Sequence, residues 1–488
     1  MRLARSFAFG VAAVGSLVAC VAAGAAGPAR HPAQHQARPA VLIGPDLRHA
    51  AGASPFPPGT AFCERRFKIA CYRPQQLEHA FYLPKLFRAG VTGKGQTIVV
   101  VDSFGSPTVR RDLAVFDRAA GLPAASLRII QPAGRVAPYR PVGDRIGWAG
   151  ETDLDVEYAH AMAPGARLLL VETPTSENEG TTGFPQIVAA EKYVIGHHLG
   201  GLISQSFSAT EESFASPRRL RSLRGAYLDA ARHGVTVLAA SGDSGAADIK
   251  YNGSAYFLRP VTSWPDSDPL VTGVGAVQLR LNSRGDRTSA PVAWNDSYSP
   301  ATNLYITGNA GPSPLASGGG KSAVFTRPSY QDGVRRVVGD RRGVPDVSMS
   351  GACDGAADVY QSFPGQPAGW YPTCGTSEAT PEFAGIAALA AQLAHRPLGP
   401  LNPYLYRLSA LRARGIADVT SGNNTVSFRQ GSKDALHTVH GFAARRGYDL
   451  VTGVGTVNAP AFVRELAWLV DHPRATGPQV RAAIARLG

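Results

Sequence analysis

The segment CGTSEATPEFAG, residues 374–385, places a Gly-Thr-Ser turn directly before a run that is typical of a helix. A serine at the start of a helix usually only caps it. The same position can also hold a nucleophile at the positive end of the helix dipole. Ser377 is therefore a candidate nucleophile, and its main-chain N–H is a candidate oxyanion donor. Pro381 is tolerable in the first turn of such a helix.

A second candidate group is the carboxyl pair Glu151 and Asp155, within residues 151–166. The two residues are four apart, so in a helix both carboxyl groups lie on one face, within reach of each other. Two close carboxylates resist double ionisation, and such a pair can abstract a proton near acidic pH, with Asp155 orienting Glu151. The alternative is a solvated acidic helix start, and the neighbouring Asp153 and Glu157 show how ordinary this spacing is.

Asp243 is the third candidate, in the segment AASGDSGAAD at 239–248. It follows an apolar run and has glycines on both sides, a composition that by default forms an Asx turn. A carboxyl group at the end of a strand can also face a site, and if protonated it can donate a hydrogen bond to an oxyanion.

The elements that must position these residues alternate between strand and helix. Apolar, β-branched runs predict buried parallel strands at 96–105, 166–173, 200–208 and 234–245, and helical stretches separate them, including 185–198 and 222–233. This alternation predicts an α/β fold that is doubly wound, with a mostly parallel sheet and helices on both faces. Catalytic groups then belong at the carboxyl ends of the strands.

The formal net charge of the 488-residue chain is +13, from 49 Lys and Arg against 36 Asp and Glu. The basic residues are scattered in short clusters such as Arg218-Arg219, without a long basic run or an RNA-binding motif. Nucleic acid is therefore not an expected partner.

The first residues predict export. Arg2 and Arg5 precede a long apolar run, and the sequence that follows is polar and contains Pro and His, so residues 1–26 are interpreted as a signal peptide rather than an anchor. Small residues at 23–25 suit ordinary signal peptidase. The run Leu-Val-Ala-Cys ending at Cys20 also resembles a bacterial lipobox, which would leave the protein lipid-anchored at the cell surface.

Four cysteines remain when Cys20 is set aside, and an even count in an exported chain favours disulfides. Sequence alone allows three connectivities. The most economical is local pairing, Cys63 with Cys71 and Cys353 with Cys374. A competing interpretation is a reactive thiol at Cys374, close to Ser377.

Taken together, these motifs resemble the sedolisins, or serine-carboxyl peptidases, which share the subtilisin-like fold. GTSEATP matches that family's Gly-Thr-Ser-x-x-x-Pro motif, ETDLD its Glu-x-x-x-Asp pair and SGDSG its oxyanion aspartate motif. The likeness spans roughly residues 72 to 465 and keeps the motifs in the same order. The resemblance implies that Ser377 is the nucleophile, Glu151 the general base and acid, Asp155 its orienting partner and Asp243 the oxyanion donor.

The same resemblance implies one structural calcium ion near the C-terminus. Its ligands would be the carboxylates of Asp418 and Asp449 and the main-chain carbonyls of Val419, Arg445 and Gly447. Two aspartates in glycine-rich loops otherwise indicate turns. Arg445 stands where the family often has glycine. Its main-chain carbonyl could still bind the ion, but its positively charged side chain would then lie close to the calcium.

Two further departures concern maturation and the nucleophile. The family usually carries a long folded propeptide, whereas here residues 27–71 are interpreted as a linker or short pro-segment before a peptidase domain at 72–470 and a polar tail at 471–488. Cys374 replaces a glycine common in the family, and a Cys353–Cys374 disulfide could stiffen the nucleophile loop.

The expected protein is a secreted serine-carboxyl endopeptidase that hydrolyses protein or peptide substrates at acidic pH through an acyl-enzyme on Ser377. It is expected to be a monomer. Alternatives are tripeptidyl-peptidase activity and an inactive exported binding protein built on a peptidase fold. A subtilisin-type triad using Asp102 is the nearest mechanistic rival, but none of the 12 histidines has the required sequence context, and His160 is interpreted as a surface or packing residue.

Overall fold

The computed structural model describes residues 54–177, 182–250 and 255–487. All of them fall within one unit of the chain, residues 36–488. The expected signal peptide, Cys20 and most of the expected linker lie outside the described residues. Among the helices in the described ranges, none has the length and apolar character needed to cross a membrane.

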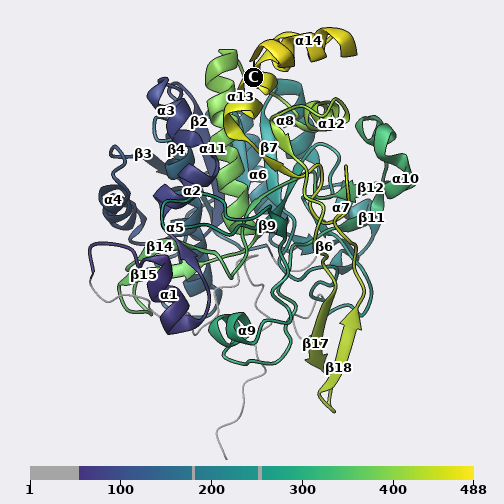
Figure 1. The fold of residues 1–488 in the computed structure, drawn as a ribbon. Helices are drawn as coiled ribbons and strands as arrows, with labels where there is room; N and C mark the ends of the chain where they lie inside the picture. Colours follow the sequence, from purple (N-terminus) through teal and green to yellow (C-terminus); the bar gives the residue numbers. More distant parts are fainter. Residues whose placement is uncertain (1–53, 178–181, 251–254, 488) are drawn as a thin grey trace, which may run out of the picture. The chain divides into compact units, whose positions relative to one another are not determined.

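A mostly parallel sheet, eight-stranded over the described residues, lies at the centre of the fold (Figure 1). Its strand order is β10-β9-β7-β5-β2-β4-β3, and β13 also pairs with β9. Strand β10 pairs antiparallel with β9, and the other pairs in this sheet are parallel. The strands are β2 Thr97–Ser103, β3 Ser126–Ile130, β4 Arg167–Thr173, β5 Leu202–Gln205, β7 Thr236–Ala240, β9 Thr272–Gln278, β10 Val292–Ala293 and β13 Val347–Ser350.

Helices cover both faces of this sheet because successive strand residues point to opposite faces. In β2, Ile98 and Val100 join one apolar cluster, whereas Val99 and Val101 join another. The first cluster includes residues of α4 Val109–Ala120, α5 Asp144–Met162, α11 Thr376–Ala394 and α13 Ala459–Asp471; the second includes residues of α6 Phe184–Gly196 and α8 Gly225–His233. The predicted fold class, a subtilisin-like doubly wound α/β sheet, is confirmed.

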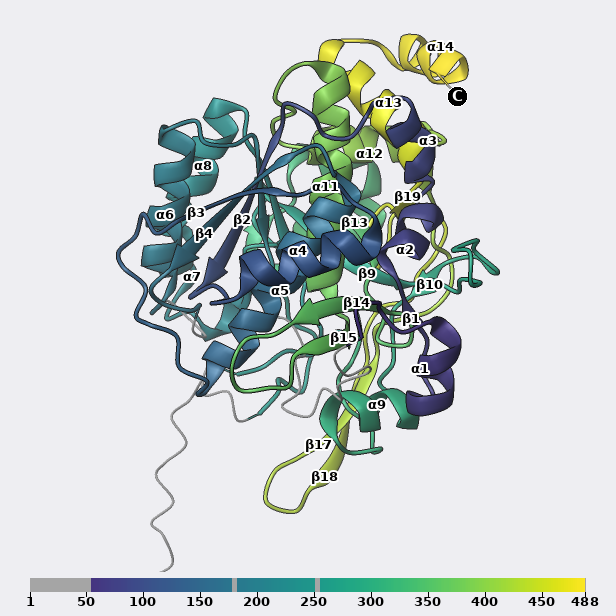
Figure 2. The same cartoon turned by 90° about the vertical axis from the view of Figure 1, so that its left-hand side faces the viewer.

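Helix α5 is buried from Trp148 to its end, so the interpretation of its acidic residues as a solvated helix start is wrong. The helix begins at Asp144, almost two turns before the predicted segment. Figure 2 shows α4 and the hairpin of β14 (Ala356–Gln361) and β15 (Gly369–Thr373) on its outer side. Sequence alone could not reveal this cover, because it comes from segments distant in the chain.

The ends of the peptidase-like domain are more structured than the sequence indicates. Within the expected linker, α1 (Thr60–Phe67) is folded, and β1 (Cys71–Tyr72) pairs with β14. The helix is held in place because Cys63 and Phe67 pack in an apolar cluster. The expected polar tail contains α14 (Gly477–Leu487), whose apolar side packs next to α13.

Both locally paired disulfides are present, Cys63–Cys71 and Cys353–Cys374. The most economical connectivity is therefore confirmed. The interpretation of Cys374 as a reactive thiol is wrong, because its sulfur is bonded to that of Cys353.

The remaining elements surround this core. The short helices are α2 Pro74–Ala80, α3 Leu83–Arg88, α7 Pro217–Arg221, α9 Pro300–Thr307, α10 Arg335–Val338 and α12 Asn402–Ala410. The peripheral strands are β6 Ala209–Thr210, β8 Ser263–Trp264, β11 Gly320–Thr326, β12 Arg341–Val344, β16 Ile416–Ala417, β17 Val426–Gln430, β18 Ala435–Val439 and β19 Thr456–Val457.

Candidate active site

Ser377 is the second residue of α11 and is fully buried. The helix begins after Gly375, whose φ of +124° is readily adopted only by glycine. The Ser377 side chain does not cap the helix, and its Oγ has no aligned hydrogen-bond partner among the described residues. The hydroxyl is therefore available for chemistry rather than committed to a structural bond.

Helix α5 carries Glu151 to the same place, because α5 and α11 pack side by side. The contact is close near the end of α5: a Cβ at Gly385 of α11 would overlap the Cβ of Met162. A glycine at this point lets the two helices approach each other closely, with Ser377 and Glu151 on facing turns.

The Glu151 carboxyl is fully buried, and burial raises its pKa well above the usual range. Nearby negative charge on Asp155 and Asp102 raises the pKa further, whereas the neighbouring Ser377 hydroxyl favours the charged form and lowers it. The two side chains are thus neighbours, although they are not aligned as a hydrogen bond in this structure. Such geometry is common in a free enzyme and tightens when substrate binds.

Asp155 lies one helical turn after Glu151 and is also fully buried. Its Oδ1 accepts a hydrogen bond of 2.8 Å from Ser206 Oγ, and Ser206 also lies 3.5 Å from the main-chain oxygen of Ser377. Burial and then the charge of Asp102 raise the pKa of Asp155. Ser206, from the segment after β5, therefore connects the carboxyl pair to the nucleophile helix.

Asp102, near the end of β2, lies beside the carboxyl side chains of Glu151 and Asp155 rather than beside a histidine. It is buried, and burial raises its pKa to about 7, while the Thr152 hydroxyl lowers it. The structure thus places a third carboxyl beside Glu151 and Asp155, a role that sequence reasoning missed. His160 is buried further along α5, where it contacts the carbonyl of Pro123, as expected for a packing residue.

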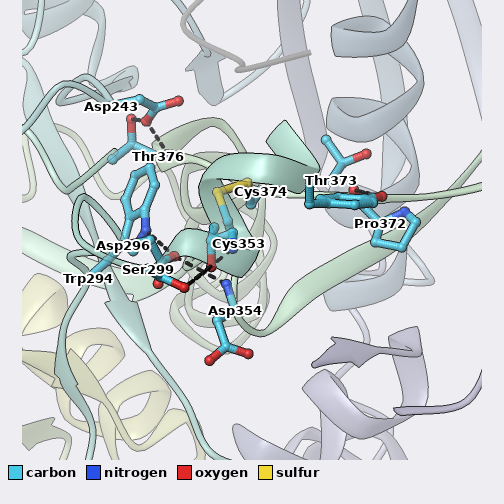
Figure 3. Close-up of a disulfide and its surroundings, with 12 residues drawn as sticks. Asp243, Trp294, Asp296, Ser299, Cys353, Asp354, Pro372, Thr373, Cys374 and Thr376 are labelled. Atoms are coloured by element: carbon cyan, nitrogen blue, oxygen red, sulfur yellow. Dashed lines mark hydrogen bonds between the residues drawn. A yellow bond between two sulfur atoms is a disulfide. The ribbon is translucent and has the colours of Figure 1, made fainter. Parts of the chain in front are cut away.

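Asp243 follows β7 and faces the turn that precedes Ser377 (Figure 3). Its Oδ1 accepts hydrogen bonds from the main-chain N–H and the hydroxyl of Thr376, at 2.7 and 2.9 Å. Its Oδ2 is buried without a partner among the described residues. Burial raises the pKa of Asp243 to about 7, although the two Thr376 bonds lower it. Below that pH the carboxyl is mostly protonated and can donate through the free oxygen.

Further buried carboxyl groups surround these residues. Asp153 and Glu157 lie on α5, and Glu378 and Glu382 on α11, and burial raises the pKa of each. Main-chain N–H groups stabilise two of them, with Tyr360 N donating to Glu157 and Ser350 N to Glu382. The only sequence signal for this set is the run of acidic residues on two otherwise apolar helices.

The five predicted calcium ligands belong to two loops that the structure brings together. Gly447 N donates to Asp418 Oδ2 at 2.9 Å, and Arg445 N donates to Asp449 Oδ2 at 3.0 Å. Asp418 is exposed and, with Gly447, borders a cavity of about 470 Å³. Val419 is buried beside Asp418. Carboxylate and main-chain carbonyl oxygens are the hard ligands that Ca²⁺ prefers, so these residue types fit the ion, although both oxygens of Asp449 also accept hydrogen bonds within its own loop.

Comparisons with known proteins identify the relatives of this chain. A model of the subtilase family matches residues 146–432. Kumamolisin from Bacillus sp. (strain MN-32) is 30% identical over 391 residues, covering 79% of this chain and 62% of the relative. Tripeptidyl-peptidase 1 from Homo sapiens is 31% identical over 339 residues, covering 66% of this chain and 52% of the relative. The chain thus spans between about half and two thirds of the length of these relatives.

A solved structure of Pseudomonas sedolisin, a serine-carboxyl proteinase, shares the fold. The TM-score is 0.64 at 24% sequence identity, covering 84% of this chain and 99% of that structure. The family model shows that the chain belongs to the subtilase family, and the relatives together with the sequence motifs identify it as a sedolisin.

Proposed function

We propose that this protein is a serine-carboxyl peptidase that hydrolyses protein or peptide substrates at acidic pH through an acyl-enzyme on Ser377. The observation that carries the proposal is the convergence of three groups. The unbonded hydroxyl of Ser377, the buried carboxyl of Glu151 and the free oxygen of Asp243 all face one turn at the start of α11.

In the first step, Ser377 Oγ attacks the carbonyl carbon of the scissile peptide while ionised Glu151 accepts its proton. Glu151 then gives this proton to the departing amine as the C–N bond breaks, which leaves an ester on Ser377. In the second step, Glu151 takes a proton from the water that attacks the ester, and returns it to Ser377 Oγ as the ester C–O bond breaks and the acid product leaves. Burial first, and then negative charge on Asp155 and Asp102, raise the pKa of Glu151.

Protonated Asp243 and the main-chain N–H of Ser377 would stabilise the oxyanion formed in both steps. The Thr376 bonds fix one oxygen of Asp243 and leave the other for this donation. Because the pKa of Asp243 is about 7, the donor is present in acid and is lost above neutral pH. A carboxyl base and a carboxyl donor together support an acidic working range.

The test is cleavage of a denatured protein substrate over about pH 3 to 8, comparing the wild type with Ser377→Ala and Glu151→Gln. Glu191→Gln is a matched control, because Glu191 is another fully buried carboxyl, without a hydrogen-bond partner in the described part of the chain, on the opposite face of the sheet. We expect loss of cleavage in the two site variants and retention in the control. Cleavage that survives Ser377→Ala would contradict the proposal, and a folded wild type without cleavage would favour a binding protein.

Endopeptidase action is our first expectation, and the tripeptidyl-peptidase relatives make removal of N-terminal tripeptides the second candidate. Matched peptides with free and blocked N-termini separate the two activities. An endopeptidase cleaves both peptides, whereas a tripeptidyl-peptidase cleaves only the free one.

We also propose export and one structural calcium ion. The export proposal rests on the N-terminal sequence and is supported by the two disulfides, which favour an oxidising environment. The calcium proposal rests on Asp418, Asp449 and the adjacent carbonyls of Val419, Arg445 and Gly447. When bound, the ion would join the two C-terminal loops, a structural rather than a catalytic contribution.

A further inference from the structure

The Cys353–Cys374 disulfide is attached directly to the turn that presents the nucleophile. Cys374 precedes Gly375, and the N–H of Gly375 donates to the carbonyl of Gly351 at 2.9 Å, two residues before Cys353. Both sulfurs belong to fully buried residues (Figure 3). One covalent bond and one hydrogen bond therefore join the start of α11 to the loop after β13.

The same loop is held from its other side by the carboxyl of Asp296. Asp296 Oδ2 accepts from Asp354 N at 3.1 Å and from Trp294 Nε1 at 2.8 Å. Figure 3 shows the main-chain nitrogen of Asp354, next to Cys353, on the side of this carboxyl, whereas the Asp354 side chain points away from it. The carboxyl is buried, so these donors lack an aqueous substitute if it is removed.

The main chain of Asp296 leads back to the oxyanion candidate. Asp296 N donates to the carbonyl of Leu315 at 2.8 Å, and the next residue, Ala316, donates its N–H to the carbonyl of Asp243 at 2.9 Å. Asp243 in turn accepts from Thr376, two residues after Cys374. The contacts form a closed circuit in which the disulfide is the covalent member.

We propose that the Cys353–Cys374 disulfide and the Asp296 carboxyl are positioning groups that fix Asp243 against the nucleophile turn. The inference rests on the proposed roles of Ser377 and Asp243. Neither positioning group touches the reacting atoms. Each acts by limiting how far Asp243 and Thr376 can separate, which sets the geometry of the oxyanion site.

The other disulfide provides a matched control. Cys63–Cys71 lies in the same apolar cluster as Cys353–Cys374 and is equally buried. It closes a loop of 8 residues instead of 21, and the entropic effect of a crosslink grows only with the logarithm of that length. Removing either bond should lower thermal stability, but only one bond belongs to the circuit around Asp243.

The experiment compares Cys353→Ala/Cys374→Ala with Cys63→Ala/Cys71→Ala, measuring kcat, KM and melting temperature on one peptide substrate across pH 3 to 8. Because misplacement by about 1 Å can cost up to about 100-fold, we expect partial loosening to lower kcat about 10-fold, with KM within about 2-fold. The control should keep the wild-type kcat while its melting temperature falls.

The pH profile gives a readout that a purely structural role would not move. Asp243 faces Thr376 donors and the acidic groups Asp248, Glu151 and Glu378. A looser turn admits water, which stabilises ionised Asp243, so the alkaline limb of kcat should move to lower pH. The control should leave this limb in place.

Asp296→Asn is the second variant, in case the first does not fold. It keeps the shape of the side chain but replaces the carboxyl, whose pKa is raised by burial to about 6, by a neutral amide that is the weaker acceptor above that pH. We expect a smaller loss of kcat and the same direction of the pH shift. Wild-type kcat and pH limb in the folded circuit variants would overturn the inference. Activity retained by Ser377→Ala would instead refute the proposed function.

Discussion

Gly375→Ala should disable the site by displacing Asp243. A Cβ built on Gly375 would lie 2.5 Å from Asp243 Oδ2, whereas ordinary contacts begin at 3.4 Å. The carboxyl must therefore move by about 0.9 Å, or the turn before Ser377 must move by a similar amount. Either movement separates the oxyanion donor from the nucleophile.

The expected size of the effect follows from this displacement. Misplacement by about 1 Å costs up to about 100-fold in rate, so kcat should fall about 100-fold, equivalent to about 2.7 kcal/mol of transition-state stabilisation. The φ of +124° at Gly375 adds a separate cost to folding, about 1–3 kcal/mol for a residue with a side chain.

The assay is steady-state cleavage of one peptide substrate together with thermal unfolding. Gly90→Ala is the matched control, because Gly90 also has a positive φ, +76°, but a Cβ there meets nothing within 4 Å. The control should lose some stability and keep its kcat. A folded Gly375→Ala variant with wild-type kcat would refute the reasoning, because the displaced carboxyl would then have no part in the rate-limiting step.

Three other predictions concern protons and calcium. The alkaline limb of kcat should lie near pH 7, where Asp243 loses its proton. The limb should weaken in Asp243→Asn, because the amide donates a hydrogen bond at every pH. An unchanged limb in this variant would show that another group causes the loss of activity. Burial raises the pKa of Glu191 from 4.5 to about 8, so the folded state holds this proton more tightly than the unfolded state does. The stability that protonated Glu191 contributes is therefore fully present below about pH 4.5 and is lost as pH rises through 8. Glu191→Gln should therefore stabilise the protein at pH 8 by at most about 4 kcal/mol and have little effect at pH 4, as measured by denaturant unfolding; equal effects at both pH values would contradict this account. Chelation of calcium should lower the melting temperature of the wild type, and this response should disappear in Asp418→Asn; a wild type indifferent to chelator would contradict the site.

Sequence was a good guide wherever chemistry and local pattern coincide. The strand before Asp243 and the helix after Gly375 are defined by apolar runs and a turn, so their positions could be predicted. The spacing of Glu151 and Asp155 placed both on one helical face. These placements are now seen in the structure, while the catalytic roles stay predictions.

Burial could not be predicted in the same way, because it depends on distant segments. The acidic residues of α5, including Asp153 and Glu157, are equally compatible with a solvated helix in sequence, and only the covering segments β14, β15 and α4 bury them. Sequence alone offers Asp102 only as the partner of a histidine in a subtilisin-type triad, because its carboxyl neighbours are brought together by the fold. The helix at 60–67 was hidden by the Pro- and Ala-rich composition of the segment before it.

The close approach of α5 and α11 at Gly385 has a consequence for the spacing of the reacting groups. Gly385 is eight residues, about 12 Å along the helix, from Ser377. A side chain there would force Met162 away and tilt one stiff helix relative to the other. Ser377 and Glu151 lie far from this contact along α11 and α5, so the distance between them would change with the tilt. The distance between the Glu151 carboxyl and the Ser377 hydroxyl therefore depends on a packing contact far from both groups, where a glycine has no side chain.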